Sequence, residues 1–348
     1  MADNKNRMIL FAARPQGEPK ASDFRLIETP TPEPGPNEMR LRVVYLGLDP
    51  IIRLRMNANT YWPSLELDKP LNGRTVTVVD KSNLPDYAPG DVIVTQGPWG
   101  DYMISNGKGM DGKPLPKFDP ARGSITAPLH VLGITGFTAY IGLLEIGQAK
   151  EGETVVISGA SGAVGSMAGQ IAKIKGCRVV GIAGGDAKCA FIKNELGFDV
   201  AVDYKRPDFA DALKAACPKG VDVYFENVGG AVFDAVFPLL NLHARVPVCG
   251  TVSEYNVTDR EAIADKMPAL LLATLGKRLT IKGFVISDHF ARMPDFQREA
   301  GGWLREGKIK YKEEFVEGLE NAPKAFNAML KAETFGKVIV KVSEAPKR

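Results

Sequence analysis

The chain has few of the side chains that hold metal ions or form disulfides. Its 348 residues include four cysteines and three histidines, and neither type occurs before His130. The cysteines are widely spaced and form no C-x-x-C pair. Zinc sites and disulfide frameworks need closely grouped ligands, so these cysteines are more typical of free thiols in a reducing compartment. The sequence therefore predicts no metal site and a structural role for each lone histidine.

Long apolar runs and an excess of charge of one sign are also absent. No stretch approaches the ~18 uninterrupted apolar residues of a membrane-spanning helix, and the first seven residues lack the apolar segment of a signal peptide. The net charge is +3, with lysine and arginine scattered along the chain. We therefore expect a cytoplasmic globular protein with no nucleic-acid partner and no membrane partner.

At this length two domains are expected, and the texture of the sequence changes near Pro128. The first 120 residues are rich in proline and glycine and contain short β-like runs at Met39–Leu46, Thr75–Asp80 and Asp91–Thr95. Such runs, separated by turn residues, predict an antiparallel, barrel-like β domain.

After this point strands and helices alternate, which is typical of a doubly wound parallel sheet. The expected strands are Thr154–Ser158, Arg178–Ala183, Val200–Asp203, Val221–Glu226, Ala244–Cys249 and Leu279–Ile286. A helical stretch is expected at Val131–Gly147, and helices between the strands at Met167–Lys175, Ala187–Leu196, Asp208–Ala216 and Ala231–Leu239.

The C-terminal end returns to the β pattern, with an extended segment at Tyr311–Glu317, a helix at Ala322–Lys331 and a β-branched strand at Lys337–Val342. The last strand cannot easily extend a sheet that already has six, so we expect it in the first domain's sheet. The predicted fold is α/β, with a β domain over 1–130 and 302–348 and a Rossmann domain over 131–301.

The segment from Thr154 to Ser166 carries the strongest signal of function. A β-branched strand stops at a glycine, two further glycines follow at three-residue intervals, and an apolar, helix-like stretch comes next. A strand, tight turn and helix in this order bring backbone N–H groups and a positive helix end to a pyrophosphate. The spacing is G-x-x-G-x-x-G, however, and the glycines could serve only close helix–strand packing. The predicted contacts are Gly159, Gly162, Ala163, Val164 and Gly165.

The end of the second strand favours NADPH over NADH. There, Gly184 and Gly185 have no side chains, which leaves room for a 2′-phosphate. Lys188, Tyr204 and Lys205 could hold that phosphate by charge-assisted hydrogen bonds. Asp186 is the contrary residue, since it could cap the next helix or bind a ribose hydroxyl.

Several segments, in this order, carry a family resemblance. The chain resembles the zinc-independent medium-chain dehydrogenases/reductases, and among them the prostaglandin reductase, alkenal double-bond reductase and curcumin reductase group. The matching segments are Gly47–Met56, Gly159–Gly165, Gly184–Lys188, Asp203–Lys205, Phe225–Gly230, Cys249–Asn256, Gly283–Ile286 and Gly336–Lys341.

The resemblance implies a GroES-like substrate domain and a Rossmann domain that binds NADPH. It implies that Lys188 and Tyr204 bind the 2′-phosphate and that Asn227 faces the central part of the cofactor. Cys249, Phe284 and Val285 would lie along the nicotinamide, although a buried packing role for Cys249 is an equal alternative.

The family's catalytic tyrosine lies in the Cys249–Asn256 segment, which implies that Tyr255 is catalytic. A phenol directed at the substrate carbonyl would stabilise the negative charge left on its oxygen after hydride transfer. The alternative is a tyrosine that only packs against the cofactor. Tyr61 and Ile51 are candidates for the substrate pocket, but Tyr61 could instead cap a loop, and some relatives have an aromatic residue where this chain has Ile51 and Ile52.

The predicted function is NADPH-dependent reduction of the C=C bond of α,β-unsaturated ketones or aldehydes, with a small electrophilic carbonyl compound as substrate. A quinone reductase shares the fold and the cofactor, and a non-catalytic NADPH-binding sensor is an alternative of another class. The resemblance also implies a homodimer, for which Thr280–Val285 is a candidate edge strand.

Overall fold

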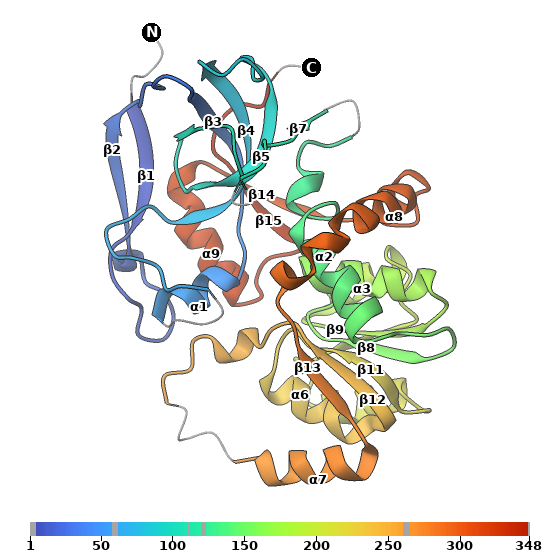
Figure 1. The fold of residues 1–348 in the computed structure, drawn as a ribbon. Helices are drawn as coiled ribbons and strands as arrows, with labels where there is room; N and C mark the ends of the chain where they lie inside the picture. The colour runs from blue at the N-terminus through green and yellow to red at the C-terminus, as the bar shows by residue number, and fades with distance from the viewer. Residues whose placement is uncertain (1–4, 58–61, 110–111, 120–122, 260–264, 347–348) are drawn as a thin grey trace. The chain divides into compact units, whose positions relative to one another are not determined.

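The computed structural model describes residues 5–57, 62–109, 112–119, 123–259 and 265–346 (Figure 1). The chain divides into two compact units: a terminal unit of Met1–Leu129 with Glu313–Arg348, and a central unit of His130–Lys312. The second division follows helix α8 (Met293–Arg305), whereas the boundary expected at 301/302 falls inside that helix. No helix in the described ranges is long and apolar enough to cross a membrane.

The central unit contains a six-stranded sheet in which every neighbouring pair is parallel. Its strand order is β10-β9-β8-β11-β12-β13, so the chain starts in the middle, moves to one edge, and then returns to build the other half. This confirms the doubly wound sheet. The strands are β8 (Thr154–Ile157), β9 (Arg178–Ala183), β10 (Val200–Asp203), β11 (Val221–Phe225), β12 (Leu240–Val248) and β13 (Thr280–Gly283).

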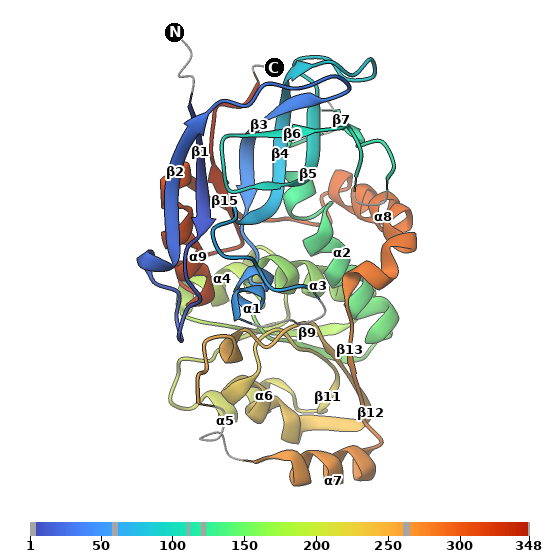
Figure 2. The same ribbon diagram turned by 60° about the vertical axis from the view of Figure 1, so that its left-hand side comes forward.

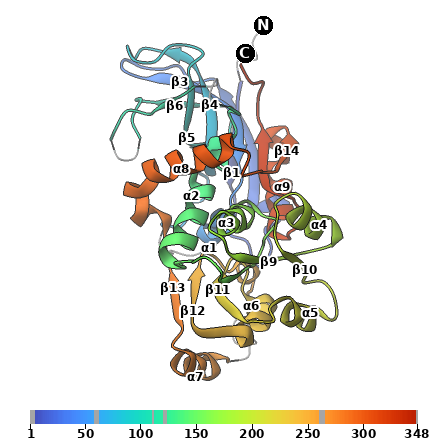
Figure 3. The same ribbon diagram turned by 90° about the vertical axis from the view of Figure 1, so that its right-hand side faces the viewer.

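Helices cover both faces of this sheet, as Figure 3 shows. On one side lie α3 and α4, and on the other α5 and α6. The inner strands β8, β9 and β11 are apolar almost throughout because both of their faces are buried. The helices of this unit are α2 (Ile134–Ile141), α3 (Ala163–Ile174), α4 (Asp186–Asn194), α5 (Phe209–Ala216), α6 (Gly230–Val236), α7 (Met267–Lys277) and α8.

The terminal unit is built around strand β3, which shares one edge between two partners (Figure 2). Its first residues pair with β6 and its last with β15, while β4 runs along the other edge. The antiparallel pairing of β15 with β3 confirms that the last strand returns to the first domain's sheet. The strands are β1 (Lys5–Phe11), β2 (Phe24–Pro30), β3 (Met39–Gly47), β4 (Asn72–Ser82), β5 (Val92–Pro98), β6 (Tyr102–Ser105), β7 (Lys117–Phe118), β14 (Glu313–Glu317) and β15 (Lys337–Lys341).

The core of the terminal unit joins segments from both ends of the chain. The fully buried Trp99 stacks on Phe24 and meets the edge of Phe326 in helix α9 (Ala322–Leu330). Aromatic rings packed in this way add to the stabilisation from buried area alone. This packing explains why the C-terminal helix and strand fold with the N-terminal residues.

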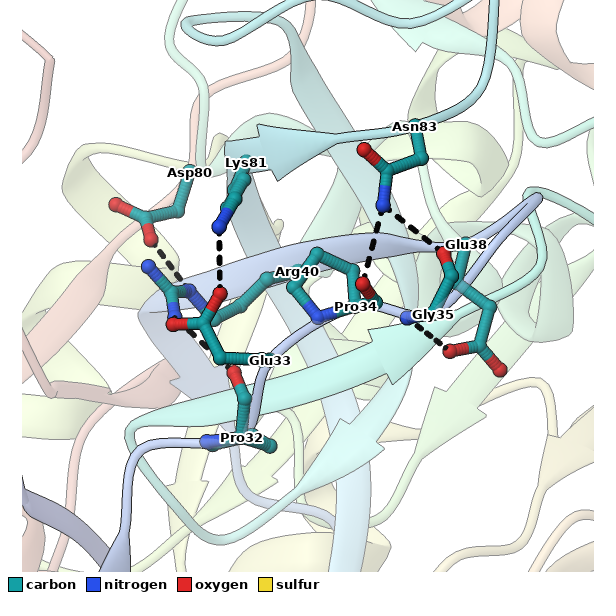
Figure 4. Close-up of polar contacts among 9 residues, drawn as sticks. All are labelled: Pro32, Glu33, Pro34, Gly35, Glu38, Arg40, Asp80, Lys81 and Asn83. Atoms are coloured by element: carbon teal, nitrogen blue, oxygen red, sulfur yellow. Dashed lines mark hydrogen bonds and ion pairs between the residues drawn. The ribbon is translucent and has the colours of Figure 1, made fainter.

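A polar cluster fastens the proline-rich loop between β2 and β3 (Figure 4). The Arg40 guanidinium donates to Asp80 at 2.6 Å and to Glu33 at 2.8 Å, and the amide of Asn83 donates to the carbonyl of Pro34 at 3.0 Å. Every group in these contacts has a protein partner, so the cluster is explained as loop anchoring.

Candidate functional site

The expected site residues of the central unit follow the carboxyl ends of adjacent strands. Gly159 follows β8, Gly184 follows β9, Asn227 follows β11 and Cys249 follows β12. Because these strands are parallel neighbours in the sheet, their carboxyl ends share one edge. Ligands of open α/β sheets bind at this edge, at the point where the strand order reverses, which here lies between β8 and β11.

The glycine turn after β8 disfavours larger residues at two positions, for different reasons. Gly159 has a φ of +60°, a left-handed conformation that favours glycine. A Cβ added at Gly165 would collide with the carbonyl oxygen of Gly159 and lie 2.9 Å from the Cα of Ala160. The glycines therefore let the first turn of α3 press directly on the loop.

The same turn leaves a helix N-terminus available for an anion. Helix α3 begins at Ala163. The residue in the cap position is Gly162, which has no side chain that could accept from the N–H groups of the first turn. The first N–H groups of a helix have no partner within it, and the helix dipole is positive at this end. This arrangement fits the pyrophosphate of a dinucleotide, for which the N–H groups of Ala163, Val164 and Gly165 would be the donors. The helix was expected to start at Met167, four residues too late.

The fully buried His130 lies at this turn. Its Nε2 is 3.3 Å from the carbonyl oxygen of Ala163, and its ring meets the edge of Tyr311 with centroids 5.6 Å apart. These contacts fit the structural role expected for this residue.

A second group gathers around Gly184. A Cβ added there would lie 2.8 Å from the Tyr204 ring and 3.1 Å from Cε of Lys205. Lys188 lies in the first turn of α4, directly after the glycine pair. Sequence reasoning gave Asp186 two roles, but Gly185 is the residue in the cap position and Asp186 is the first residue of the helix. The cap interpretation is therefore wrong by one residue.

Asp203 fixes this second group, and sequence reasoning missed its role. Its Oδ1 accepts hydrogen bonds from the N–H groups of Gly185 and Lys205, both at 2.9 Å. Burial tends to raise the pKa of Asp203, but these two hydrogen bonds outweigh it, so the pKa is lowered. An aspartate that bonds to the N–H two residues later is a recognisable turn signal, so the Asp203-Tyr204-Lys205 sequence could have indicated it.

The segment with Tyr255 folds back over the end of β12. A Cβ added at Gly250 would be 3.1 Å from the Tyr255 hydroxyl and 3.5 Å from the carbonyl oxygen of Asn227. The tyrosine hydroxyl therefore lies close to the residues that follow β11 and β12. Cys249 is partly buried, and its burial, together with the charge of Glu226, raises the pKa of its thiol to about 12. A neutral thiol is a poor nucleophile, which favours a packing or contact role.

The remaining candidates are two residues after β13 and two in the terminal unit. Phe284 and Val285 follow β13, and the Phe284 ring packs on Gly142, where an added Cβ would be 2.6 Å from it. Ile51 is the first residue of helix α1 (Ile51–Asn57) in the terminal unit and is half-buried. Tyr61 lies outside the described residues. Within the described part of the chain, no group of three or more His, Cys, Asp or Glu side chains is arranged to hold a metal ion.

Comparison with known proteins gives the family. Residues 7–112 match a family model described as the N-terminal domain of oxidoreductase, and residues 163–299 match one described as zinc-binding dehydrogenase. The chain is 48% identical to the NADPH-dependent curcumin reductase of Escherichia coli, over 97% of both proteins. It is 35% identical to the 2-alkenal reductase (NADP(+)-dependent) of Nicotiana tabacum, over 97% of this chain and 98% of that protein.

A solved structure shows the same fold over the whole chain. The CurA protein of Vibrio vulnificus in complex with NADPH is 46% identical, with a TM-score of 0.92 over 97% of this chain and 100% of that one. The chain therefore belongs to the medium-chain dehydrogenase/reductase family of oxidoreductases. Within that family its relatives include the zinc-independent curcumin, alkenal and prostaglandin reductases.

Proposed function

We propose that the protein is an NADPH-dependent reductase of the C=C bond of α,β-unsaturated ketones or aldehydes. The single observation that carries the proposal is the placement of the glycine turn, the Gly184 group and the Tyr255 segment after neighbouring parallel strands. Its relatives named as NADPH-dependent curcumin reductase and 2-alkenal reductase support the reaction class.

The cofactor is held by the chain at two places in this proposal. The N–H groups at the start of α3 bind the pyrophosphate. The side chains of Lys188 and Tyr204 bind the 2′-phosphate beside Gly184, whose missing side chain lets the Tyr204 ring lie close to the backbone. Next to Tyr204, the Oδ1 of Asp203 accepts two hydrogen bonds, from the N–H groups of Gly185 and Lys205. Asn227, Cys249, Phe284 and Val285 are proposed to line the rest of the cofactor site.

Tyr255 is proposed as the catalytic residue. Bound NADPH supplies a hydride, which goes to the β-carbon of the substrate. Negative charge then develops on the carbonyl oxygen, and the Tyr255 hydroxyl donates a hydrogen bond to that oxygen. A proton from water then reaches the α-carbon and completes the saturated carbonyl product. The terminal unit is proposed as the substrate domain, with Ile51 among the substrate contacts.

The test of this function is a turnover assay with a panel of enones and enals. NADPH oxidation should be accompanied by formation of the saturated carbonyl, identified by mass spectrometry. Tyr255→Phe should lower kcat by roughly 10-fold to 100-fold, because one hydrogen bond to the developing charge is lost, while NADPH binding changes little. An allylic alcohol as product would contradict C=C reduction, and an unchanged kcat would exclude Tyr255 as the catalytic residue.

We also propose that two copies of the chain associate through their central units. Strand β13 is the last strand of its sheet, and all four of its residues are exposed. Beside it, α7 has no buried residue, and Leu271, Leu272 and Leu275 are 61%, 71% and 77% exposed. An open sheet edge next to an apolar patch is typical of a surface that pairs with its own copy.

The ends of α7 are held by polar contacts. Lys277 donates hydrogen bonds to the carbonyl oxygens of Pro238 at 2.9 Å and Leu240 at 2.8 Å, and Lys266 forms an ion pair with Asp234. These contacts fix the helix on the central unit without burying its leucines. A second copy of the chain would cover them.

A further inference from the structure

A buried carboxylate lies among the strand ends of the candidate site. Glu226 is 1% exposed and follows directly after β11. Its Oε1 accepts hydrogen bonds from the Ser158 hydroxyl at 2.8 Å and from the N–H groups of Val228 at 2.6 Å and Gly229 at 3.0 Å. Its Oε2 accepts the Tyr224 hydroxyl at 2.6 Å. Four donors surround the group, so both oxygens of the carboxylate act as acceptors.

Ser158 connects this carboxylate to the next residue, Asn227. The Ser158 hydroxyl, which donates to Glu226, also accepts the N–H of Asn227 at 2.8 Å. The side-chain amide of Asn227 donates to the Ser158 carbonyl, again at 2.8 Å. The ends of β8 and β11 are thereby joined through a network in which the carboxylate is the central acceptor.

Hydrogen bonds join the Cys249–Tyr255 segment to the residues that follow β11. The backbone carbonyl of Glu226 accepts the N–H of Cys249 at 2.8 Å. Further along, the carbonyl of Val228 accepts both the N–H of Ser253 at 2.9 Å and its hydroxyl at 2.6 Å.

A further bond runs to the same short turn, η6 (Val252–Glu254), whose next residue is Tyr255. The carbonyl of Asn227 accepts the N–H of Val252 at 3.2 Å. The acceptors are the backbone carbonyls of three consecutive residues, Glu226, Asn227 and Val228. The backbone of these residues therefore holds the turn that precedes Tyr255.

We propose that Glu226 is a positioning residue, which holds the Cys249–Tyr255 segment so that the Tyr255 hydroxyl stays beside Gly250. The effect on turnover rests on the proposed function, in which that hydroxyl acts on the substrate carbonyl. In this proposal Glu226 acts through the backbone of Val228 and Asn227.

The central test compares Glu226→Gln with Asp222→Asn. Asp222 is a matched control because it lies on β11, the strand that leads to Glu226, and joins neighbouring segments, accepting the N–H of Thr154 and the amide of Asn241, both at 2.8 Å. These contacts lie at the amino end of β11, whereas Glu226 follows its carboxyl end. Glu226→Gln should lower kcat about 10-fold, while the Kd for NADPH measured by fluorescence changes less than about threefold. Asp222→Asn should leave kcat within about twofold of the wild type.

A double variant shows whether Glu226 acts through the tyrosine. If it does, adding Glu226→Gln to Tyr255→Phe should lower kcat by less than about twofold further, because coupled residues are not additive. Fully multiplied losses would overturn the proposal. So would an unchanged kcat in Glu226→Gln beside a low kcat in Tyr255→Phe, although the proposed function would then stand.

Alkylation of Cys249 gives a readout that needs neither cofactor nor turnover. In Glu226→Gln the segment loosens and the neighbouring negative charge is lost, so iodoacetamide should modify Cys249 at least about fivefold faster. Cys217, which is buried elsewhere in the unit, serves as the internal control. An unchanged Cys249 rate would overturn the proposal, even if the wild type reduces no enone and the proposed function fails. If Glu226→Gln does not fold, Tyr224→Phe, which removes one donor, should change both readouts in the same direction.

Discussion

Single residues determine whether the turn after β8 can form, and glycine is needed at Gly159 and Gly165 for different reasons but not at Gly162. At Gly159 the backbone itself is left-handed, with φ of +60°. At Gly165 the neighbouring backbone leaves no room for a Cβ. Gly162 has φ of −79°, which any residue can adopt, and an added Cβ would lie 3.2 Å from the nearest atom. The glycine pattern alone cannot distinguish these cases.

Gly165→Ala should therefore be much more harmful than Gly162→Ala. The first variant forces the start of α3 away from the turn, with a loss of about 1–3 kcal/mol in the free energy of unfolding and weaker NADPH binding. The second should lose about 1 kcal/mol or less, because alanine can adopt this conformation and only the preference for glycine over alanine at the cap position is lost. Thermal unfolding and NADPH fluorescence titration measure both. Equal losses in the two variants would contradict the steric explanation.

At the scale of elements, the sequence predicts some bounds well and misses others: the strand expected at Ala244–Cys249 begins at Leu240, whereas the helix expected at Asp208–Ala216 begins one residue later, at Phe209. The strand Arg178–Ala183 has the predicted bounds because β-branched residues fill it and a glycine pair ends it. The helix expected from Met167 starts at Ala163 instead, because close packing of Gly165 on the turn overrides its low helix propensity. Helix α8 was not predicted, since two adjacent glycines weaken its local signal; the buried Phe296, packed on Phe137 and Tyr140, supplies what propensity lacks.

The site shows the same limit. The glycines, Lys188 and Tyr204 could be predicted because their side chains, or lack of them, suit a ligand directly. The role of Glu226 could not be predicted, although this residue lies in the Phe225–Gly230 segment. Its role depends on the hydroxyl donors of Ser158 and Tyr224, which only the fold brings to it. A carboxylate at the end of an apolar strand was the available signal.

Strand β14 makes the stability of the terminal unit depend on pH. The carboxyl of its first residue, Glu313, accepts the Thr126 hydroxyl at 2.8 Å, and its other oxygen is buried with no hydrogen-bond partner among the described residues. Burial raises the pKa of Glu313 from its usual 4.5, although Thr126 and Lys337 partly oppose this. The stabilising contribution of the protonated group is complete below the usual pKa and is lost as the pH rises through the raised value.

Glu313→Gln should therefore stabilise the protein at neutral pH. The amide keeps an oxygen that can accept from Thr126 and has no charge to bury, so the melting temperature should exceed that of the wild type by about 2 °C at pH 7. Near pH 4.5 the difference should disappear. Glu317→Gln is the control, since its side chain is on the same strand and 74% exposed. A difference that does not vary with pH would exclude the carboxyl as its cause.

At the scale of the whole molecule, the parallel sheet separates two kinds of surface. The carboxyl ends of its strands carry the candidate site, while its last strand and α7 present open backbone groups and exposed leucines. A large apolar patch on a monomer is unusual unless a partner covers it. The sequence alone could indicate the edge strand but not the patch, because the leucines of α7 are equally compatible with a buried helix.

Association of two copies predicts a specific response to charge on α7. Wild-type protein should sediment as a dimer at micromolar concentrations, and the double variant Leu271→Glu with Leu275→Glu should sediment as a monomer, because two carboxylates per copy cannot be buried against the same patch of a second copy. The control is Leu26→Glu, which changes a leucine of the terminal unit that is 47% exposed and should leave the dimer intact. The helix itself should survive, since its ends are held by Lys266 and Lys277, and unchanged circular dichroism would verify that. A monomeric wild type, or a variant that still forms dimers, would contradict this surface as the interface.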